Sequence, residues 1–352
     1  MKTKSISILI VSIIFMGAYY TACDSTEMMS AKVYIQENNL ESAEEHALMA
    51  VENETANPFP SYWLAVNVYS KQERWEEMIA MFDKSLSISP KFAAEIKNLS
   101  EFHWVNEFND GANLFNVVLN GESSNPDSAL STALKSFEKA TIIIPERAQA
   151  YASIASIYLH TKDVDSAKKY LIKSAELDST DFKSLVNLGI IYSKEKDYEK
   201  GDGYLNKVLE LEPGNLIALQ QLAQNLDSQG KSEEAEATYH KALEADPENA
   251  NLMYNLGVIY LRADNYEKAE EMFVGSLKLN PDDCDAISNV AVVYSNLEGR
   301  LADAENYLLR AVDCAPAETI YWRQLVGIYM KMRKPDKAQN ALDKAKELGY
   351  KP

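Results

Sequence analysis

Small, large apolar and polar positions recur along this chain with one fixed period. Five aromatic or leucine residues stand 34 positions apart: Tyr158, Tyr192, Leu226, Tyr260 and Tyr294. Three residues before each of them stands a small residue: Ala155, Gly189, Ala223, Gly257 and Ala291. Because self-similarity at a fixed period of this length is typical of repeat architectures, one unit of about 34 residues is expected to recur along the chain.

A second set of positions completes each unit. Another small residue follows twelve positions after the first, the last time after one extra residue: Ala167, Gly201, Ala235, Ala269 and Ala304. A large apolar residue lies four positions further on: Leu171, Leu205, Tyr239, Phe273 and Leu308. Proline closes most units, at Pro213, Pro247, Pro281 and Pro316. Small residues let a neighbouring helix approach, large ones fill the holes, and proline ends a helix, so the pattern predicts stacked helix-turn-helix units.

This pattern resembles the tetratricopeptide repeat family. The resemblance implies an all-α fold, a right-handed superhelical solenoid of about nine units with a concave and a convex side. A degenerate first unit carries Ala31, Tyr34, Ala43 and Ala50. The predicted units leave no room for another domain and occupy residues 24–57, 59–92, 93–147, 148–181, 182–215, 216–249, 250–283, 284–318 and 319–352.

The third unit departs from the pattern. Apolar residues recur every three or four positions from residue 93 to 115, which predicts one long amphipathic helix: Ile96, Leu99, Phe102, Val105, Phe108, Ala112 and Phe115. A polar loop over 120–126 separates it from a second helix with Ala133, Phe137 and Ala140. The insertion either thickens the solenoid or serves binding, and both interpretations remain open.

Four asparagines lie beside this apolar stripe, spaced three, four and three positions apart: Asn106, Asn109, Asn113 and Asn116. The family register places them on first-helix positions that face the groove. Asparagine is a poor helix former, so the presence of four on one face of a helix needs an explanation. Hydrogen bonding to a peptide backbone is one, and solvation of an exposed face is the other.

The N-terminus has the plan of an export signal. Lys2 and Lys4 precede an apolar run from Ile6 to Tyr20, which predicts a signal peptide over residues 1–22. The tetrapeptide ending at Cys23 resembles the lipobox of bacterial lipoproteins, although Tyr20 stands where Leu, Val or Ile is usual. The resemblance implies lipid attachment at Cys23 and an exported protein anchored to a bacterial envelope membrane, facing the periplasm. Simple secretion and an uncleaved anchor are the alternatives.

Charge and residue spacing narrow the function. With 53 acidic and 35 basic residues the formal charge is -18, which argues against nucleic acid as a partner. No two of the four histidines have metal-ligand spacing. No phosphate loop, dinucleotide fingerprint or nucleophile elbow occurs in the sequence. We therefore expect no metal, no cofactor and no enzyme activity.

The family resemblance implies a protein or peptide partner, bound in the concave groove lined by first helices. Chaperone-binding members hold a C-terminal carboxylate with a Lys and Asn pair, an Asn, and a Lys and Arg pair on three successive first helices. The central Asn is matched by Asn187, Asn255 and Asn289, but the units before them offer Ala152 with Ser156, Gln220 with Gln224, and Tyr254 with Val258, so the clamp is not present. The groove residues expected here are Asn106, Asn109, Asn113, Ser156, His160, Asn187, Gln220, Gln224, Tyr254, Arg262, Asn289 and Arg323.

These features favour a non-catalytic envelope scaffold. Lipoproteins of this family serve pilus assembly, secretion and outer-membrane protein assembly, and the sequence does not choose among them. The alternative is a carbohydrate-associated or enzyme-accessory lipoprotein that binds polymer in the groove. Exposed groove aromatics would favour it, and only Trp63 and Tyr254 map there.

Two further cysteines lie in the eighth unit, Cys284 at the start of its first helix and Cys314 near the end of its second. Antiparallel helices bring those ends to the same edge, and export would place them in an oxidising compartment, so the sequence predicts a disulfide. The alternative is a buried free thiol, since Cys314 stands where sister units have Leu211 or Leu279.

Overall fold

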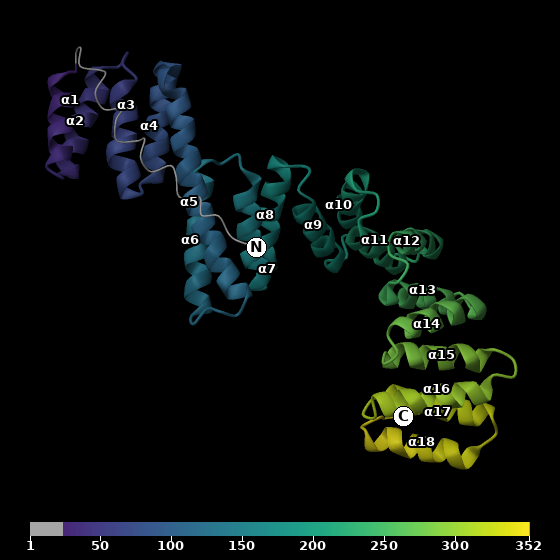
Figure 1. Ribbon diagram of the computed structural model, residues 1–352. Coiled ribbons are helices and arrows are strands. Elements are labelled where there is room, and N and C mark those ends of the chain that lie inside the picture. Colours follow the sequence, from purple (N-terminus) through teal and green to yellow (C-terminus); the bar gives the residue numbers. More distant parts are fainter. Residues whose placement is uncertain (1–23, 352) are drawn as a thin grey trace, which may run out of the picture. The chain divides into compact units, whose positions relative to one another are not determined.

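The computed structural model describes residues 24–351, and these residues contain helices and turns but no strand. The described residues divide into two compact units, the first ending at Asp178 and the second beginning at Ser179. Within each unit, successive helices pack in consecutive pairs (Figure 1). The predicted all-α architecture of stacked helix pairs is confirmed. The predicted signal peptide 1–22 and Cys23 lie outside the described residues.

The first unit contains α1 to α8 and three short helical segments. They are α1 (Thr26–Gln36), α2 (Leu40–Asn53), α3 (Phe59–Leu64), η1 (Ala65–Tyr69), η2 (Ser70–Gln72), α4 (Trp75–Ile88), η3 (Pro90–Phe92), α5 (Ala93–Leu119), α6 (Pro126–Ile143), α7 (Ala148–His160) and α8 (Val164–Leu177). The π-helical η1 and the 3-10 segment η2 continue α3, which the sequence pattern did not predict.

The second unit contains five regular pairs. They are α9 (Phe182–Lys194), α10 (Tyr198–Leu211), α11 (Leu216–Ser228), α12 (Ser232–Ala245), α13 (Ala250–Arg262), α14 (Tyr266–Leu279), α15 (Cys284–Asn296), α16 (Leu301–Cys314), α17 (Thr319–Lys331) and α18 (Pro335–Glu347). No helix within residues 24–351 is both long and apolar enough to cross a lipid bilayer.

The turn inside each pair follows the same period as the core. A residue with left-handed backbone ends the first helix, with φ of 64° at Lys162, 63° at Lys196, 77° at Gly230 and 54° at Asp264. A side chain often caps the next helix, as when Asn265 accepts a hydrogen bond from the Lys268 N–H at 3.3 Å. The one extra residue of the eighth unit lies in its turn, before Gly299.

The predicted pairing of small and large positions is confirmed. A Cβ placed on Gly189 of α9 would lie 2.7 Å from the Leu205 side chain of α10, and one on Gly257 of α13 would lie 2.9 Å from the ring of Phe273 on α14. Since ordinary contacts are longer, each glycine allows the large residue of the second helix to sit against the first helix.

The long helix of the third unit runs further than predicted, to Leu119, and the predicted loop ends where α6 begins at Pro126. The predicted apolar stripe is wrong in part. Ile96 is buried, but Phe102 is 55% exposed and Val105 37% exposed. The reason is that repeated steps of three residues drift around a helix of about 3.6 residues per turn, so only part of the stripe meets α6, where Phe108 and Gly111 lie against Phe137.

Candidate binding surface on the first helices

The first helix of each pair presents one side to its partner and leaves another side open. In the second unit α9 contacts α11, and α15 contacts both α13 and α17, so these first helices are neighbours. Cross-helix hydrogen bonds connect them, as from Ser288 of α15 to Gln324 of α17 at 2.7 Å. In the first unit α5 contacts α7. The open side of these helices is called here the first-helix surface.

The first unit contributes five of the predicted groove residues. Asn106, Asn109 and Asn113 of α5 are exposed, and their side chains make no hydrogen bond with any residue in 24–351. Ser156 of α7 is half-buried and donates to the Ala152 carbonyl within its own helix at 2.9 Å. His160 is exposed, and its ring meets the edge of Phe115 with centroids 6.0 Å apart.

Four predicted groove residues of the second unit are engaged within the chain. Arg262 of α13 forms an ion pair with Asp227 of α11. Asn289 of α15 donates to the Tyr254 hydroxyl of α13 at 3.1 Å, and burial raises the pKa of Tyr254. The guanidinium of Arg323 lies 4.7 Å from the centre of the Tyr350 ring. A ligand would have to displace or extend these contacts.

The remaining predicted residues are available. Asn187 of α9, and Gln220 and Gln224 of α11, are half-buried and bond to no side chain or backbone group of residues 24–351. A carboxamide offers a hydrogen-bond donor and an acceptor without charge. The first-helix surface therefore combines free amides with side chains that already pair with each other.

A buried polar network between α9, α10 and α11 was missed at the sequence level. Asn225 is 1% exposed and donates at 2.7 Å to both Ser193 and Asp202. Gln229 donates to the other oxygen of Asp202 at 2.9 Å. The repeat register could have revealed this network, because Asn225 stands at a position that is apolar in sister units: Ile191, Ile259 and Val293. The network fixes three helices against one another.

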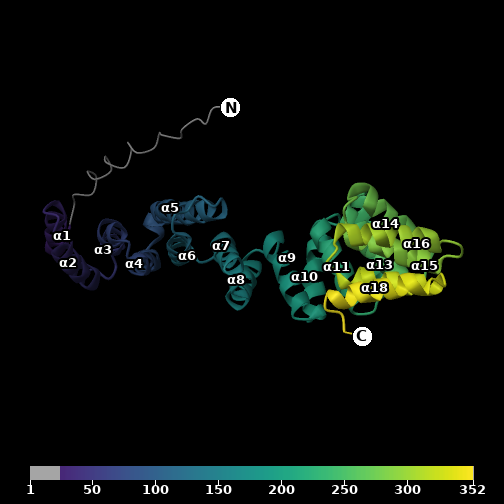
Figure 2. The same ribbon diagram turned by 90° about the horizontal axis from the view of Figure 1, so that it is seen from below.

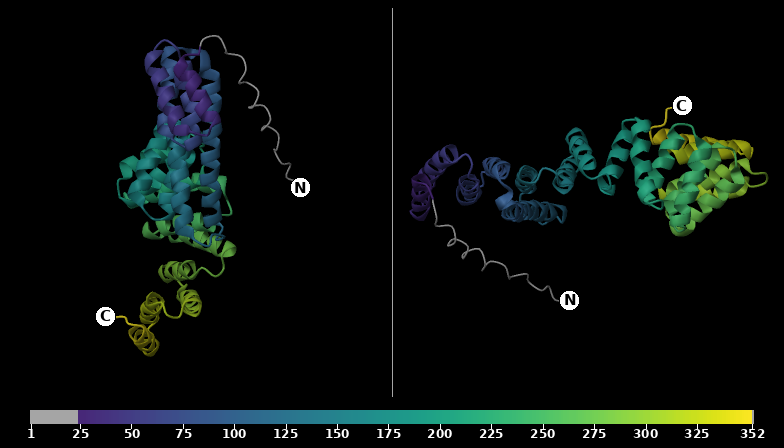
Figure 3. Two further views of the ribbon diagram at one scale, coloured as in Figure 1. Left: turned by 90° about the vertical axis from the view of Figure 1, so that its left-hand side faces the viewer. Right: turned by 90° about the horizontal axis from the view of Figure 1, so that it is seen from above.

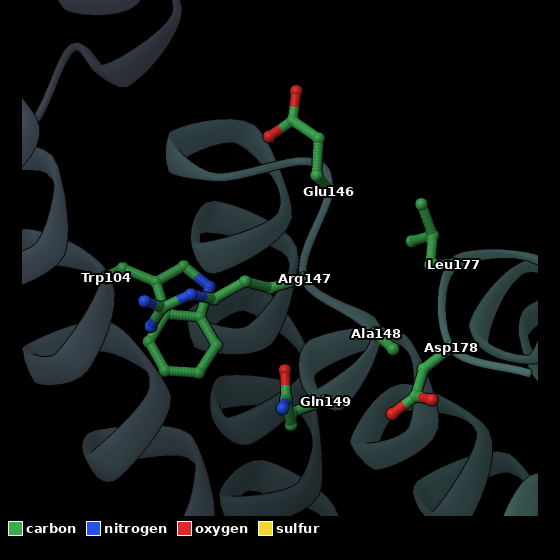
Figure 4. Close-up of a pocket in the computed structure, with 7 residues that line it drawn as sticks. All are labelled: Trp104, Glu146, Arg147, Ala148, Gln149, Leu177 and Asp178. Atoms are coloured by element: carbon green, nitrogen blue, oxygen red, sulfur yellow. The ribbon is translucent and has the colours of Figure 1, made fainter. Parts of the chain in front are cut away.

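A pocket of about 570 Å³ lies in the first unit, beside the start of α7 (Figure 4). The Arg147 guanidinium lies 4.3 Å from the centre of the Trp104 indole and pairs with Glu101. Glu146 and Asp178 carry carboxylates at its rim. Within residues 24–351 no three metal-binding side chains are clustered. The pocket is distinct from the exposed asparagines of α5.

The aromatic content of the surface is lower than the sequence suggested. Trp63, which maps to the groove by register, is only 8% exposed and belongs to the core of the first unit. Tyr254 is half-buried, bonded to Asn289 and packed edge-on against Phe273. Neither ring is free to stack on a flat ligand.

Comparison with protein-family models decides the family. The tetratricopeptide repeat model matches residues 59–92, 148–181 and 182–215. A second model, for the middle tetratricopeptide-like domain of cilia and flagella-associated protein 70, matches residues 219–349. The chain belongs to the tetratricopeptide repeat family. The three ranges of the first model coincide with three of the predicted units.

Solved structures share the tetratricopeptide fold. A tetratricopeptide repeat protein from Parabacteroides merdae is 16% identical, with a TM-score of 0.50 over 70% of this chain and 94% of that chain. PilF of Pseudomonas aeruginosa is 22% identical, with a TM-score of 0.50 over 57% of this chain and 91% of that chain. No curated protein matches the chain at a significant level. These identities are too low to support more than the fold.

Proposed function

We propose that this tetratricopeptide repeat protein is a non-catalytic scaffold that binds a polypeptide partner along its first-helix surface. The observation that carries the proposal is the set of amide side chains on this surface that bond to nothing within residues 24–351, such as Asn187 and Gln220. A carboxamide presents the same donor and acceptor pair as a peptide group, so these side chains suit a polypeptide ligand.

We further propose that the scaffold works at the bacterial cell envelope, held by lipid on Cys23. The lipobox-like residues before Cys23 support this location, and so do Lys2 and Lys4 followed by the short apolar run. Because the first helix begins at Thr26, the repeats would lie close to the membrane.

The anchor predicts a labelling result. Cells supplied with labelled fatty acid should incorporate it into the wild-type protein, which should sediment with membranes. Cys23→Ser should lose both properties. The double variant Cys284→Ser/Cys314→Ser is the matched control and should keep the label. If the Cys23→Ser protein were labelled as strongly as the wild-type protein, Cys23 would not be the site of lipid attachment and this part of the proposal would fail.

The binding surface predicts where a partner crosslinks. A photo-crosslinking residue at position 187, 220 or 224 should give an adduct with one partner in native envelope fractions. The same residue at the exposed positions 207 and 241 of the second helices α10 and α12 should not. The partner's identity would then name the pathway.

Substitution of free amides should weaken that partner's binding. Gln220→Ala/Gln224→Ala removes two hydrogen-bonding side chains and should raise the Kd about thirtyfold, given a net value of about 1 kcal/mol for each hydrogen bond. Titration calorimetry with the purified partner measures this. Lys207→Ala/Lys241→Ala is the control on the second helices, and a larger loss there would place the binding surface on the opposite side.

A further inference from the structure

The pocket beside the start of α7 is called here the α7 pocket. Its lining comes from three places in the first unit: Trp104 of α5, Glu146 and Arg147 in the loop before α7, and Leu177 at the end of α8. Figure 2 and the right-hand panel of Figure 3 show α5, α6 and α7 as neighbours within residues 24–178. With a volume of about 570 Å³ the pocket has room for a small molecule.

The N-terminus of α7 lacks the side-chain cap that the repeat usually supplies. At the N-cap of four first helices in the second unit, aspartate or asparagine accepts a hydrogen bond from a backbone N–H of the first turn: Asp181, Asn215, Asn249 and Asp283. The fifth, α17, has Glu318 and no such bond. At the same position α7 has Arg147, which cannot accept one. The N–H groups of Gln149 and Ala150 therefore have no side-chain acceptor.

A second donor without an acceptor lines the same pocket. Trp104 is 6% exposed, and its indole Nε1 is buried without a hydrogen-bond partner. Figure 4 shows this nitrogen on the side of the ring that faces Ala148 and Gln149. Three other side chains within residues 24–351 hold a buried polar atom without a partner, and none of them lines this pocket: Glu54, Ser61 and Trp75. Because a buried N–H without an acceptor is costly, an acceptor from a ligand is expected at Trp104.

Arg147 adds a positive charge to these donors. Its guanidinium lies over the Trp104 ring and pairs with Glu101 through Nη2, while Nε and Nη1 bond to nothing within residues 24–351. A ligand carboxylate can accept from these nitrogens and from the uncapped turn of α7, where the helix dipole also favours negative charge. Because Nε1 of Trp104 is enclosed, the Arg147 side chain has to turn toward the ligand before the indole N–H can bond to it.

The rim of the pocket excludes a simple anion. Glu146 is exposed and Asp178 half-buried, and both place carboxylates there. Since Glu101 already balances the charge of Arg147, two further carboxylates would repel a ligand that is only negative. A ligand with an ammonium group next to its carboxylate is attracted by the rim and by the donors together. A free amino acid carries both groups on one carbon.

We propose that the α7 pocket binds a free α-amino acid. Its carboxylate accepts hydrogen bonds from Arg147, Trp104 and the first turn of α7, and its ammonium group lies beside Glu146 and Asp178. The site is separate from the first-helix surface and does not depend on the proposed scaffold function. It also explains the arginine at the N-cap of α7, because a capping aspartate or asparagine would occupy the place of the ligand's carboxylate.

Titration calorimetry of the full-length Cys23→Ser protein with each of the proteinogenic L-amino acids tests the proposal. At least one of them should bind saturably. Its amide lacks the carboxylate and its N-acetyl derivative lacks the ammonium group, so each should bind at least about tenfold more weakly. In ¹H–¹⁵N spectra the amino acid should shift the indole resonance that Trp104→Phe removes.

Two variants test the charged groups. Arg147→Asn introduces the cap of the sister units and should weaken binding about tenfold or more, while its midpoint of thermal unfolding should not fall because the new cap stabilises α7. Glu146→Gln changes an exposed side chain and should also weaken binding. Glu248→Gln is the matched control, since Glu248 is exposed at the same position of the seventh unit, beside the capped helix α13, and should leave the affinity unchanged.

Four results would overturn the proposal. They are no saturable binding of any amino acid, binding that both Arg147→Asn and Glu146→Gln leave unchanged, a ligand that shifts only the other indole resonances, and acetate or a peptide with a free N-terminus binding as tightly as the amino acid. Acetate would indicate a site for anions alone, and the peptide a site for a chain end. Crosslinking at positions 187, 220 and 224 tests the scaffold function independently of these results.

Discussion

Phe273→Ala is expected to lower the free energy of unfolding of the second unit by about 3 to 5 kcal/mol, the usual cost of emptying a buried phenylalanine site. Phe273 of α14 is 0% exposed. Its ring fills the space left by the missing side chain of Gly257 and meets Tyr254 edge-on, with centroids 5.7 Å apart. Since Gly257 has no side chain that could move into the vacated volume, the cavity should persist.

Amide hydrogen exchange of the Phe273→Ala protein shows which helices lose stability. Because each helix pair contacts only its neighbours, amides of α13 and α14 should lose the most protection. Denaturant unfolding followed by circular dichroism gives the change in free energy. Phe182→Ala is the matched control, since Phe182 lies in the same unit but is 39% exposed and leaves no enclosed cavity, so it should cost only about 1 to 2 kcal/mol. Similar losses for both variants would contradict the packing role assigned to Phe273.

The contact between Phe273 and Gly257 could be predicted from the sequence because it recurs. Large and small positions recur at the same spacing in four units, and in the eighth unit with one extra residue, so the assignment does not depend on a single match. The long helix of the third unit has no counterpart with which to align it. Spacing alone therefore groups Phe102 and Val105 with Ile96, although only Ile96 is buried.

The candidate surface could be predicted in outline but not in its pairings. The register identifies which residues lie on first helices, such as Asn187 and Gln224. It does not say which side chains meet across helices, because this depends on the rotation and offset between successive pairs. The ion pair of Arg262 with Asp227 and the hydrogen bond between Asn289 and Tyr254 both depend on that offset.

The cysteines of the eighth unit show how exposure chooses between two sequence-level interpretations. The buried-thiol interpretation relied on Leu211 and Leu279 at the matching position of sister units. Those leucines are 47% and 42% exposed, and Cys314 is exposed as well. A free cysteine at this position would therefore not be a core residue. In the structure Cys284 and Cys314 are joined, with Cα atoms 5.7 Å apart.

The disulfide itself stays a prediction for the exported protein, and thiol titration is its direct measurement. Unfolded, unreduced Cys23→Ser protein should show no reactive thiol, because the remaining two cysteines are bonded. Detection of two reactive thiols would show that Cys284 and Cys314 are not joined. Addition of reductant before unfolding should expose both thiols and serves as the positive control for the reagent.

Loss of the bridge is expected to lower the free energy of unfolding by about 3 to 4 kcal/mol in the chain-entropy model, given the 30 residues that separate the two cysteines. The bond joins the start of α15 to the end of α16, so its loss should loosen the eighth pair first. Denaturant unfolding with and without reductant measures the effect on Cys23→Ser protein. The triple variant Cys23→Ser/Cys284→Ser/Cys314→Ser should have the lower free energy of unfolding from the start, and reductant should not change it. If reductant lowered the stability of the triple variant as well, the loss would not be due to this disulfide.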